Sequence, residues 1–106
     1  NVFANAGSSA SNWTAKTADY TAVNGDWLIV NTASSAITIT LNASPVLGDT
    51  VKIVDGSGNA ATNNITVDRN TKNINGTAAN LTIDINRASV ELVYYDTTNG
   101  WILIGT

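Results

Sequence analysis

The stretch GDTVKIVDGSGNAATNNITVD, residues 48–68, decides the fold class. Val51 and Ile53 alternate with polar residues, a glycine-rich polar run follows, and Ile65 and Val67 then alternate with polar residues again. A period of two places the apolar side chains on one face of a strand and the polar side chains on the other. The stretch therefore predicts a strand, a loop and a second strand, and its pattern points to no chemistry.

The same alternation recurs along the chain, whereas no helical period is sustained anywhere. It predicts an all-β fold, a sandwich or small barrel of about seven to nine mostly antiparallel strands. We expect strands at 26–31, 36–41, 50–54, 64–68, 81–85, 90–95 and 100–104. We expect one core formed by Ile37, Ile39, Leu41, Val51, Ile53, Ile65, Val67, Leu81, Ile83, Val90 and Leu92.

Two hairpins are expected. Asn24-Gly25 separates the β-rich segments 19–23 and 26–31, and Asn-Gly favours the type I′ turn of a two-residue hairpin. A second hairpin joins 90–95 to 101–104 through a turn at 96–100. Segments beginning at Gly25 and at Gly48 also resemble each other, which indicates either an internal duplication or two hairpins with the same turn chemistry. The spacing is too irregular to predict a solenoid.

Residues 1–18 are predicted to be an N-terminal arm or linker, and residues 19–106 a single β domain. The first segment is mostly Asn, Ala, Ser and Gly, with Phe3 and Trp13 as its large side chains. Two interpretations stay open. The arm is either flexible and extended, or it packs on a neighbouring molecule and buries Phe3 and Trp13.

Charge and composition exclude several classes of function. Charged residues make up 12% of the chain, and its five basic residues are scattered, so we expect no nucleic-acid partner. No run of about 18 apolar residues exists, so we expect no membrane partner. The chain has no Cys and no His, which removes thiolate chemistry, the commonest general base and the commonest metal ligand.

The sequence offers residues for three kinds of site, but their patterns lead us to expect no enzyme, no metal and no cofactor. Residues 55–59 carry oxygen ligands at alternate positions, but Ala60 and Thr66 occupy the positions that a calcium loop gives to Gly and Glu, which favours a turn. The eight acidic residues are spread singly, unlike the paired carboxylates of glycosidases. Aromatic residues that could stack on sugars are Trp13, Tyr20, Tyr94, Tyr95 and Trp101, although core or interface positions are more usual for them.

The segments 28–30 and 101–104 are apolar on both faces, and 90–95 is nearly so. A small domain has one core, so a second apolar face predicts contact with an arm or with another subunit. The predicted oligomer or docking interface has two parts. The residues of 90–95 and 101–104 that point away from the core form one part, and the two large aromatic residues of the arm form the other. Its members are Phe3, Trp13, Val93, Tyr95, Ile102 and Ile104.

The segments that carry a family resemblance are 39–58, 64–70, 74–76, 81–85, 88–94 and Gly100-Trp101. Through them, much of the chain resembles β-rich modules of tail fibres, head fibres and capsid decoration proteins of tailed bacteriophages. The resemblance covers roughly residues 19–106 and rests on structural motifs. It implies a non-enzymatic virion structural protein, located in the extracellular particle, that forms a homo-oligomer, most often a trimer, and docks on other virion proteins.

Two functions of different classes follow. The first is the virion module, a capsid decoration protein or part of a tail or head fibre. The second is a carbohydrate-binding module that recognises a host surface glycan. The first requires the doubly apolar strands to be covered by a partner, whereas the second requires at least two aromatic side chains exposed on one face.

Overall fold

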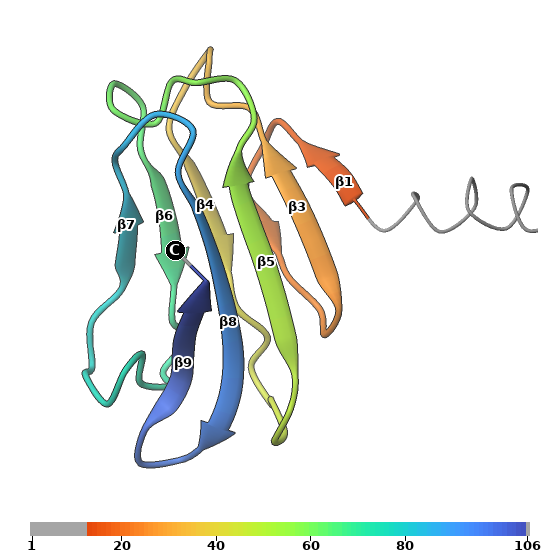
Figure 1. Cartoon of the computed structure of the whole chain (residues 1–106), viewed down its shortest axis with the longest axis vertical. Coiled ribbons are helices and arrows are strands. Elements are labelled where there is room, and N and C mark those ends of the chain that lie inside the picture. Colours follow the sequence, from red (N-terminus) through yellow and green to blue (C-terminus); the bar gives the residue numbers. More distant parts are fainter. Residues whose placement is uncertain (1–12, 106) are drawn as a thin grey trace, which may run out of the picture.

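The computed structural model describes residues 13–105, which form nine strands in two sheets and no helix (Figure 1). One sheet has five strands in the order β1-β3-β5-β8-β9, and the other has four in the order β2-β4-β6-β7. The strands are β1 (Trp13–Lys16), β2 (Tyr20–Thr21), β3 (Asp26–Val30), β4 (Ile37–Thr40), β5 (Thr50–Asp55), β6 (Ile65–Asp68), β7 (Leu81–Ile83), β8 (Ser89–Asp96) and β9 (Gly100–Gly105).

The all-β prediction is confirmed, and each of the seven predicted strands is present with ends that differ by at most two residues. The two sheets lie face to face with one apolar core between them, and they do not close into a barrel (Figure 1). Ten of the eleven predicted core side chains are buried, and Leu81 is half-buried. The core also holds Leu28, Val30, Ile74, Tyr94 and Trp101.

The prediction of mostly antiparallel pairing is wrong. From β1 to β6 the chain alternates between the two sheets, so the strands that become neighbours within a sheet run in the same direction. Four strand pairs are parallel, and three are antiparallel. The physical reason is that each loop crosses from one sheet to the other, and a parallel pair requires such a crossover in place of a tight hairpin.

The predicted hairpin at Asn24-Gly25 is also wrong, because β2 and β3 belong to different sheets. The amide of Asp26 donates to the carbonyl oxygen of Val23 over 3.1 Å, which closes a four-residue turn. Gly25 has a φ of 88°, whereas Asn24 has a negative φ. A positive φ at the third turn position alone is the requirement of a type II turn, which here redirects the chain to the opposite sheet.

The internal resemblance reflects successive parallel turns of the chain. Residues Ile37, Thr38 and Ile39 of β4 pair in register with Ile65, Thr66 and Val67 of β6. Likewise, β3 pairs in register with β5. The interpretation as two hairpins is therefore wrong, because the similar segments are parallel neighbours within one sheet. Like side chains pair between β4 and β6, whereas β3 and β5 pair two positions away from the alignment that their Gly-Asp motifs suggest. The spacing is irregular, as predicted.

The N-terminal segment differs from the prediction as well. Residues 13–16, which we expected to belong to the arm, form the edge strand β1 and pair with β3. Trp13 packs edge-to-face on Trp27 of the same chain, with ring centroids 5.4 Å apart. Phe3 and the rest of residues 1–12 lie outside the described part of the chain.

The predicted C-terminal hairpin is confirmed, because β8 and β9 are antiparallel neighbours with Tyr94 opposite Trp101. Residues 73–76 run along the outer edge of β9. The amide of Trp101 donates to the carbonyl oxygen of Asn73 over 2.8 Å, and the amide of Asn75 donates to the carbonyl oxygen of Trp101 over 2.7 Å. This loop satisfies backbone groups that an edge strand otherwise exposes.

Candidate interface on the five-stranded sheet

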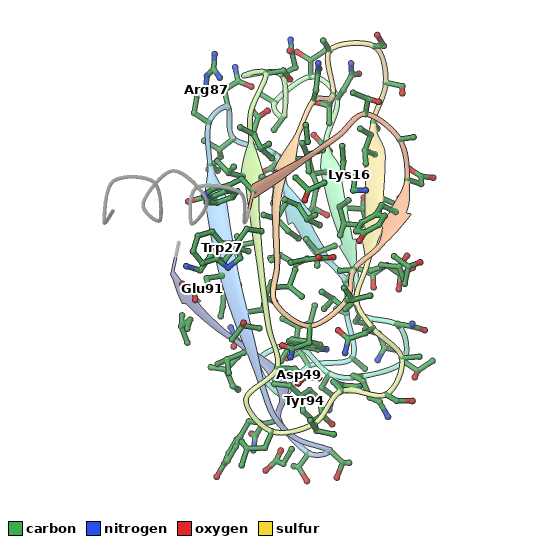
Figure 2. All side chains as sticks on the ribbon, turned by 90° about the vertical axis from the view of Figure 1, so that its right-hand side faces the viewer. Lys16, Trp27, Asp49, Arg87, Glu91 and Tyr94 are labelled. Atoms are coloured by element: carbon green, nitrogen blue, oxygen red, sulfur yellow. The ribbon has the colours of Figure 1, made fainter. Side chains whose placement is uncertain are left out.

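The side of the five-stranded sheet that points away from the core is called the outer face below. Strand alternation and register assign its members. The apolar ones are Trp13, Ala15, Trp27, Ile29, Val54, Val93, Tyr95, Ile102 and Ile104, and the polar ones are Thr50, Lys52, Ser89 and Glu91. Figure 2 shows Trp27 and Glu91 on this side of the sheet.

Large apolar side chains on the outer face are accessible to solvent. Ile29 is 40% exposed, Trp13 44%, Tyr95 55% and Ile104 56%. Exposed apolar groups gathered on one face mark an interaction surface more often than the same groups scattered singly. The outer face therefore has the composition expected of a contact surface.

The outer face carries two charged side chains among the described residues, and they lie next to each other near its centre. Lys52 and Glu91 are opposite each other on β5 and β8, and the Lys52 Nζ to Glu91 Oε2 distance is 3.9 Å. The Lys52 ammonium also lies over the ring of Trp27, 4.1 Å from its centroid. Lys52 is thus held between an aromatic ring and a carboxylate, and the charges of this face sum to zero.

A shallow apolar hollow of about 420 Å³ opens on the outer face between Trp13, Ile29, Val54 and Ser89. Three of its lining residues belong to one row across the sheet, because Ile29 pairs with Val54 and Val54 with Ser89. The hydroxyl of Ser89 is the polar side-chain group in this lining. The hollow therefore suits an apolar side chain better than a strongly hydrated ligand.

The outer side of the four-stranded sheet has a different character. Thr38, Thr66 and Thr82 form one row across it, and Thr21, Thr40 and Asp68 form another. The five threonines, which are hydroxyl-bearing and β-branched, fit a pleated, solvated surface. Among the strands, exposed large apolar side chains are thus confined to the five-stranded sheet, whereas the other exposed ones, Val23, Val46, Leu47 and Ile85, lie in loops.

The structure brings four of the six predicted interface residues together. Val93 and Ile102 are cross-strand partners, and Tyr95 and Ile104 are exposed on the same two strands. Trp13 joins the outer face from β1, at the opposite edge of the sheet. Phe3 lies outside the described residues. Sequence reasoning missed Trp27, Lys52 and Val54, although their parity relative to Leu28 and Ile53 could have assigned them to this face.

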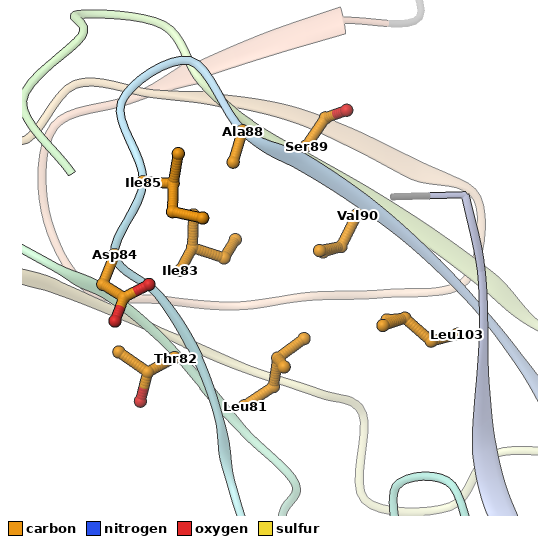
Figure 3. A pocket seen from close by; sticks show the side chains of 9 residues that line it. All are labelled: Leu81, Thr82, Ile83, Asp84, Ile85, Ala88, Ser89, Val90 and Leu103. Carbon is orange, nitrogen blue, oxygen red and sulfur yellow. The ribbon is translucent and has the colours of Figure 1, made fainter. Parts of the chain in front are cut away.

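A second apolar opening lies where the two sheets part, between β7 and the β8–β9 pair (Figure 3). It has a volume of about 390 Å³, and Leu81, Ile83, Ile85, Val90 and Leu103 contribute its apolar wall. Ile85 at its rim is 68% exposed. This groove is continuous with the core, so its lining residues also contribute to folding.

Residues 55–59 form the turn that the sequence favoured over a calcium loop. The buried Asp55 carboxylate accepts hydrogen bonds from the amides of Gly58, Ala60 and Arg87, at 3.0, 3.1 and 2.9 Å. Burial by itself would raise the pKa of the Asp55 carboxyl, but these amides, with that of Asn59, together hold it below its ordinary value. Both carboxylate oxygens are already engaged by the backbone.

The Asp26 carboxylate also serves a turn. The Asp26 carboxylate accepts from the Tyr20 hydroxyl and from the Val23 amide, both over 2.9 Å. The hydrogen bond between Tyr20 and Asp26, burial and the negative charge of Asp26 together raise the pKa of Tyr20. Among residues 13–105, no three Asp, Glu, His or Cys side chains gather where they could hold a metal ion.

The predicted sugar-stacking aromatics divide into two groups. Tyr94 and Trp101 are buried and pack edge-to-face with ring centroids 5.5 Å apart. Tyr20 is half-buried, whereas Trp13 and Tyr95 are exposed on the outer face. Trp13 and Tyr95 come from β1 and β8, which are separated in the sheet by β3 and β5.

No model of a protein family matches the chain, and no curated protein matches it either. Over the described residues, the chain has no helix long and apolar enough to cross a membrane.

Proposed function

We propose that the chain is a non-enzymatic structural module of a bacteriophage virion, a capsid decoration protein or part of a tail or head fibre. It acts by homo-oligomerisation and by docking on other virion proteins through the outer face. One observation carries the assembly part of the proposal: the outer face exposes Trp13, Ile29, Tyr95 and Ile104, while the outer rows of the other sheet hold five threonines and Asp68.

Physical chemistry supports contact through this face. Burial of apolar surface contributes about 25 cal/mol per Å², and Trp and Tyr are the residues that most often dominate interface energies. The chain has a net charge of -3 over 106 residues, so repulsion between copies is weak. The assignment to a virion, and hence to the extracellular particle, rests on the resemblance of residues 39–58 and of the shorter segments 64–70, 74–76, 81–85, 88–94 and 100–101 to phage fibre and decoration modules.

The first prediction concerns Val93. Val93→Asp is expected to dissociate the assembly, because a carboxylate buried without a partner costs several kcal/mol. We expect the dissociation constant to rise at least about tenfold, with Ile102→Asp acting alike from the neighbouring strand. Sedimentation velocity across the micromolar range measures the effect. Far-UV circular dichroism verifies that the β fold is retained.

Thr82→Asp is the matched control, since it introduces the same carboxylate at an exposed strand position of the other sheet. It is expected to leave the assembly intact. If the unaltered protein sediments as a monomer throughout this range, the assembly proposal is wrong. If Val93→Asp and Thr82→Asp behave alike, the contact lies on a different surface.

Carbohydrate binding is the second candidate, and the exposed indole ring of Trp13, on which a sugar ring can stack, is the observation that favours it. Under this alternative, Trp13→Ala abolishes binding to a glycan array that the unaltered protein labels. Val93→Asp, which lies away from the hollow, retains that binding. If the unaltered protein binds no glycan on the array at high micromolar concentration, carbohydrate binding is ruled against.

A further inference from the structure

We infer that the outer face is covered by the same face of a second copy. A two-fold axis relates the two copies; it runs parallel to the strands and lies midway between β5 and β8. This inference rests on the proposed function, because it names the partner and the geometry of the proposed assembly. It is carried by the placement of charge on the outer face.

The charge pattern is self-complementary. Lys52 and Glu91 occupy the same row on adjacent strands, and they are the charged members of the outer face within residues 13–105. Their side chains are about one-third exposed, at 31% and 32%. A surface with one positive and one negative group side by side is complementary to itself, provided that the second copy exchanges the two positions.

Two orientations of a face-to-face pair keep the strands aligned and place the Lys52–Glu91 rows of the two copies on each other, and the charges distinguish them. An axis perpendicular to the strands, through the Lys52–Glu91 row, places Lys52 over Lys52 and Glu91 over Glu91. An axis parallel to the strands and midway between β5 and β8 places each Lys52 over the Glu91 of the other copy. Since like charges in an interface are strongly disfavoured, the second orientation is selected.

The same axis brings apolar groups together. In the sheet order β1-β3-β5-β8-β9, an axis between β5 and β8 exchanges β3 with β9. Trp27, Lys52, Glu91 and Gly105 share one row, so Trp27 of one copy then faces the end of β9 of the other, beside Ile104. Two sheets stacked in this way lie about 10 Å apart with nearly aligned strands, the usual packing of β-sandwiches.

The size of the face predicts the strength of the contact. Across this axis the strands β3, β5, β8 and β9 of the two copies overlap, and at about 4.8 Å apart and about 20 Å long on average they give a face on the order of 20 by 20 Å. Two such faces bury roughly 1,000 Å² in total once side-chain relief is included, which is the lower end for specific interfaces. We therefore expect a dissociation constant in the micromolar range, which repeated contacts on a particle would strengthen.

Charge reversal tests the geometry. Lys52→Glu alone and Glu91→Lys alone each place like charges opposite each other, so each variant is expected to weaken self-association at least about tenfold. An equimolar mixture of the two variants restores association, because each copy of one then meets an oppositely charged copy of the other. The double variant Lys52→Glu, Glu91→Lys associates like the unaltered protein. Sedimentation equilibrium measures all four samples.

Asp84→Lys is the matched control: it makes the same change of charge as Glu91→Lys at an exposed position away from the outer face, and it leaves association unchanged. If neither single reversal changes the dissociation constant, the inference is wrong. The proposed assembly would then use a different surface. Failure of the mixture to associate also overturns the inference. A two-fold pair can consist of one copy of each variant, whereas a ring of three must contain at least one contact between two copies of the same variant. A monomeric unaltered protein overturns the proposed function as well.

Discussion

Replacement of Asp55 by alanine is expected to lower the free energy of unfolding by about 3–5 kcal/mol, because it removes a buried carboxylate that three backbone amides use as their acceptor. The amides of Gly58 and Ala60 belong to the loop after β5, and that of Arg87 to the turn before β8. All three lose a charge-assisted hydrogen bond together. Since domains of this size are stable by about 5–15 kcal/mol, the variant should be partly unfolded at moderate temperature.

Chemical denaturation of Asp55→Ala and of Asp84→Ala measures this effect. Asp84 is exposed, so its replacement is expected to change the stability by less than about 0.5 kcal/mol. Asp55→Asn keeps one acceptor oxygen and should fall between the two. If Asp55→Ala is no less stable than Asp84→Ala, the carboxylate does not hold the two loops together as the structure indicates.

The same group predicts a dependence on pH. The pKa of Asp55 is lower in the folded chain than its ordinary value of 3.8, so the folded state prefers the ionised form. Its contribution to stability is therefore fully present above the unfolded-state pKa and is lost as the pH falls through the folded-state pKa. Acid should destabilise the unaltered protein more than Asp55→Asn, which has no carboxyl group to protonate at this position.

The strands could be predicted from the sequence because alternation is a local property. The buried side of a strand can be read from its own alternating residues, such as Val51 and Ile53 or Ile37 and Ile39, without knowledge of any other strand. The parity of Val93 and Ile102 likewise assigns them to a second face. The candidate interface was therefore half predicted, through the two strands whose second face is also apolar.

The pairing of the strands could not be predicted in this way, because a turn sequence does not specify which sheet the chain enters next. Asn24-Gly25 is compatible with a hairpin and with a type II turn, and the choice depends on the burial of Leu28 and Val30 against the opposite sheet. The repeat was hidden for a related reason. Trp13 pairs with Trp27, 14 positions later, whereas Asp26 pairs with Val51, 25 positions later, so no fixed period exists.

The charged centre of the outer face was missed because it is visible only in register. Lys52 and Glu91 are 39 positions apart in the sequence and become neighbours through the β5–β8 pairing. Trp27 completes the row from β3. In the sequence each of the three looks like an isolated outward-facing residue. Their common position at the centre of an apolar face is a property of the sheet.

Gly100→Ala is the substitution with the second largest expected effect, a loss of about 2–4 kcal/mol in the free energy of unfolding. Gly100 has a φ of 71°, which disfavours any side chain, and an added Cβ would overlap the carbonyl group of Asn73. The obstructing atoms are backbone, so the loop at residues 73–76 must move away from β9. That movement breaks its hydrogen bonds with Trp101.

Gly25→Ala separates the two causes. Gly25 has a φ of 88°, but a Cβ there would meet nothing within 4 Å among the described residues. It should cost about 1–2 kcal/mol, the conformational penalty alone. Chemical denaturation of both variants gives the difference, which is the energy of the clash and of the broken hydrogen bonds. If the two variants are equally stable, the loop is not held against β9.

Displacement of this loop has a second expected result, because it uncovers the edge of a strand whose side chains are largely apolar. An exposed, apolar edge strand pairs readily with other chains. Gly100→Ala should therefore form large, polydisperse species in light scattering, whereas Val93→Asp should yield monomers. The two variants would thus disturb association in opposite directions, since one exposes the backbone edge of β9 and the other places a charge on the outer face beside it.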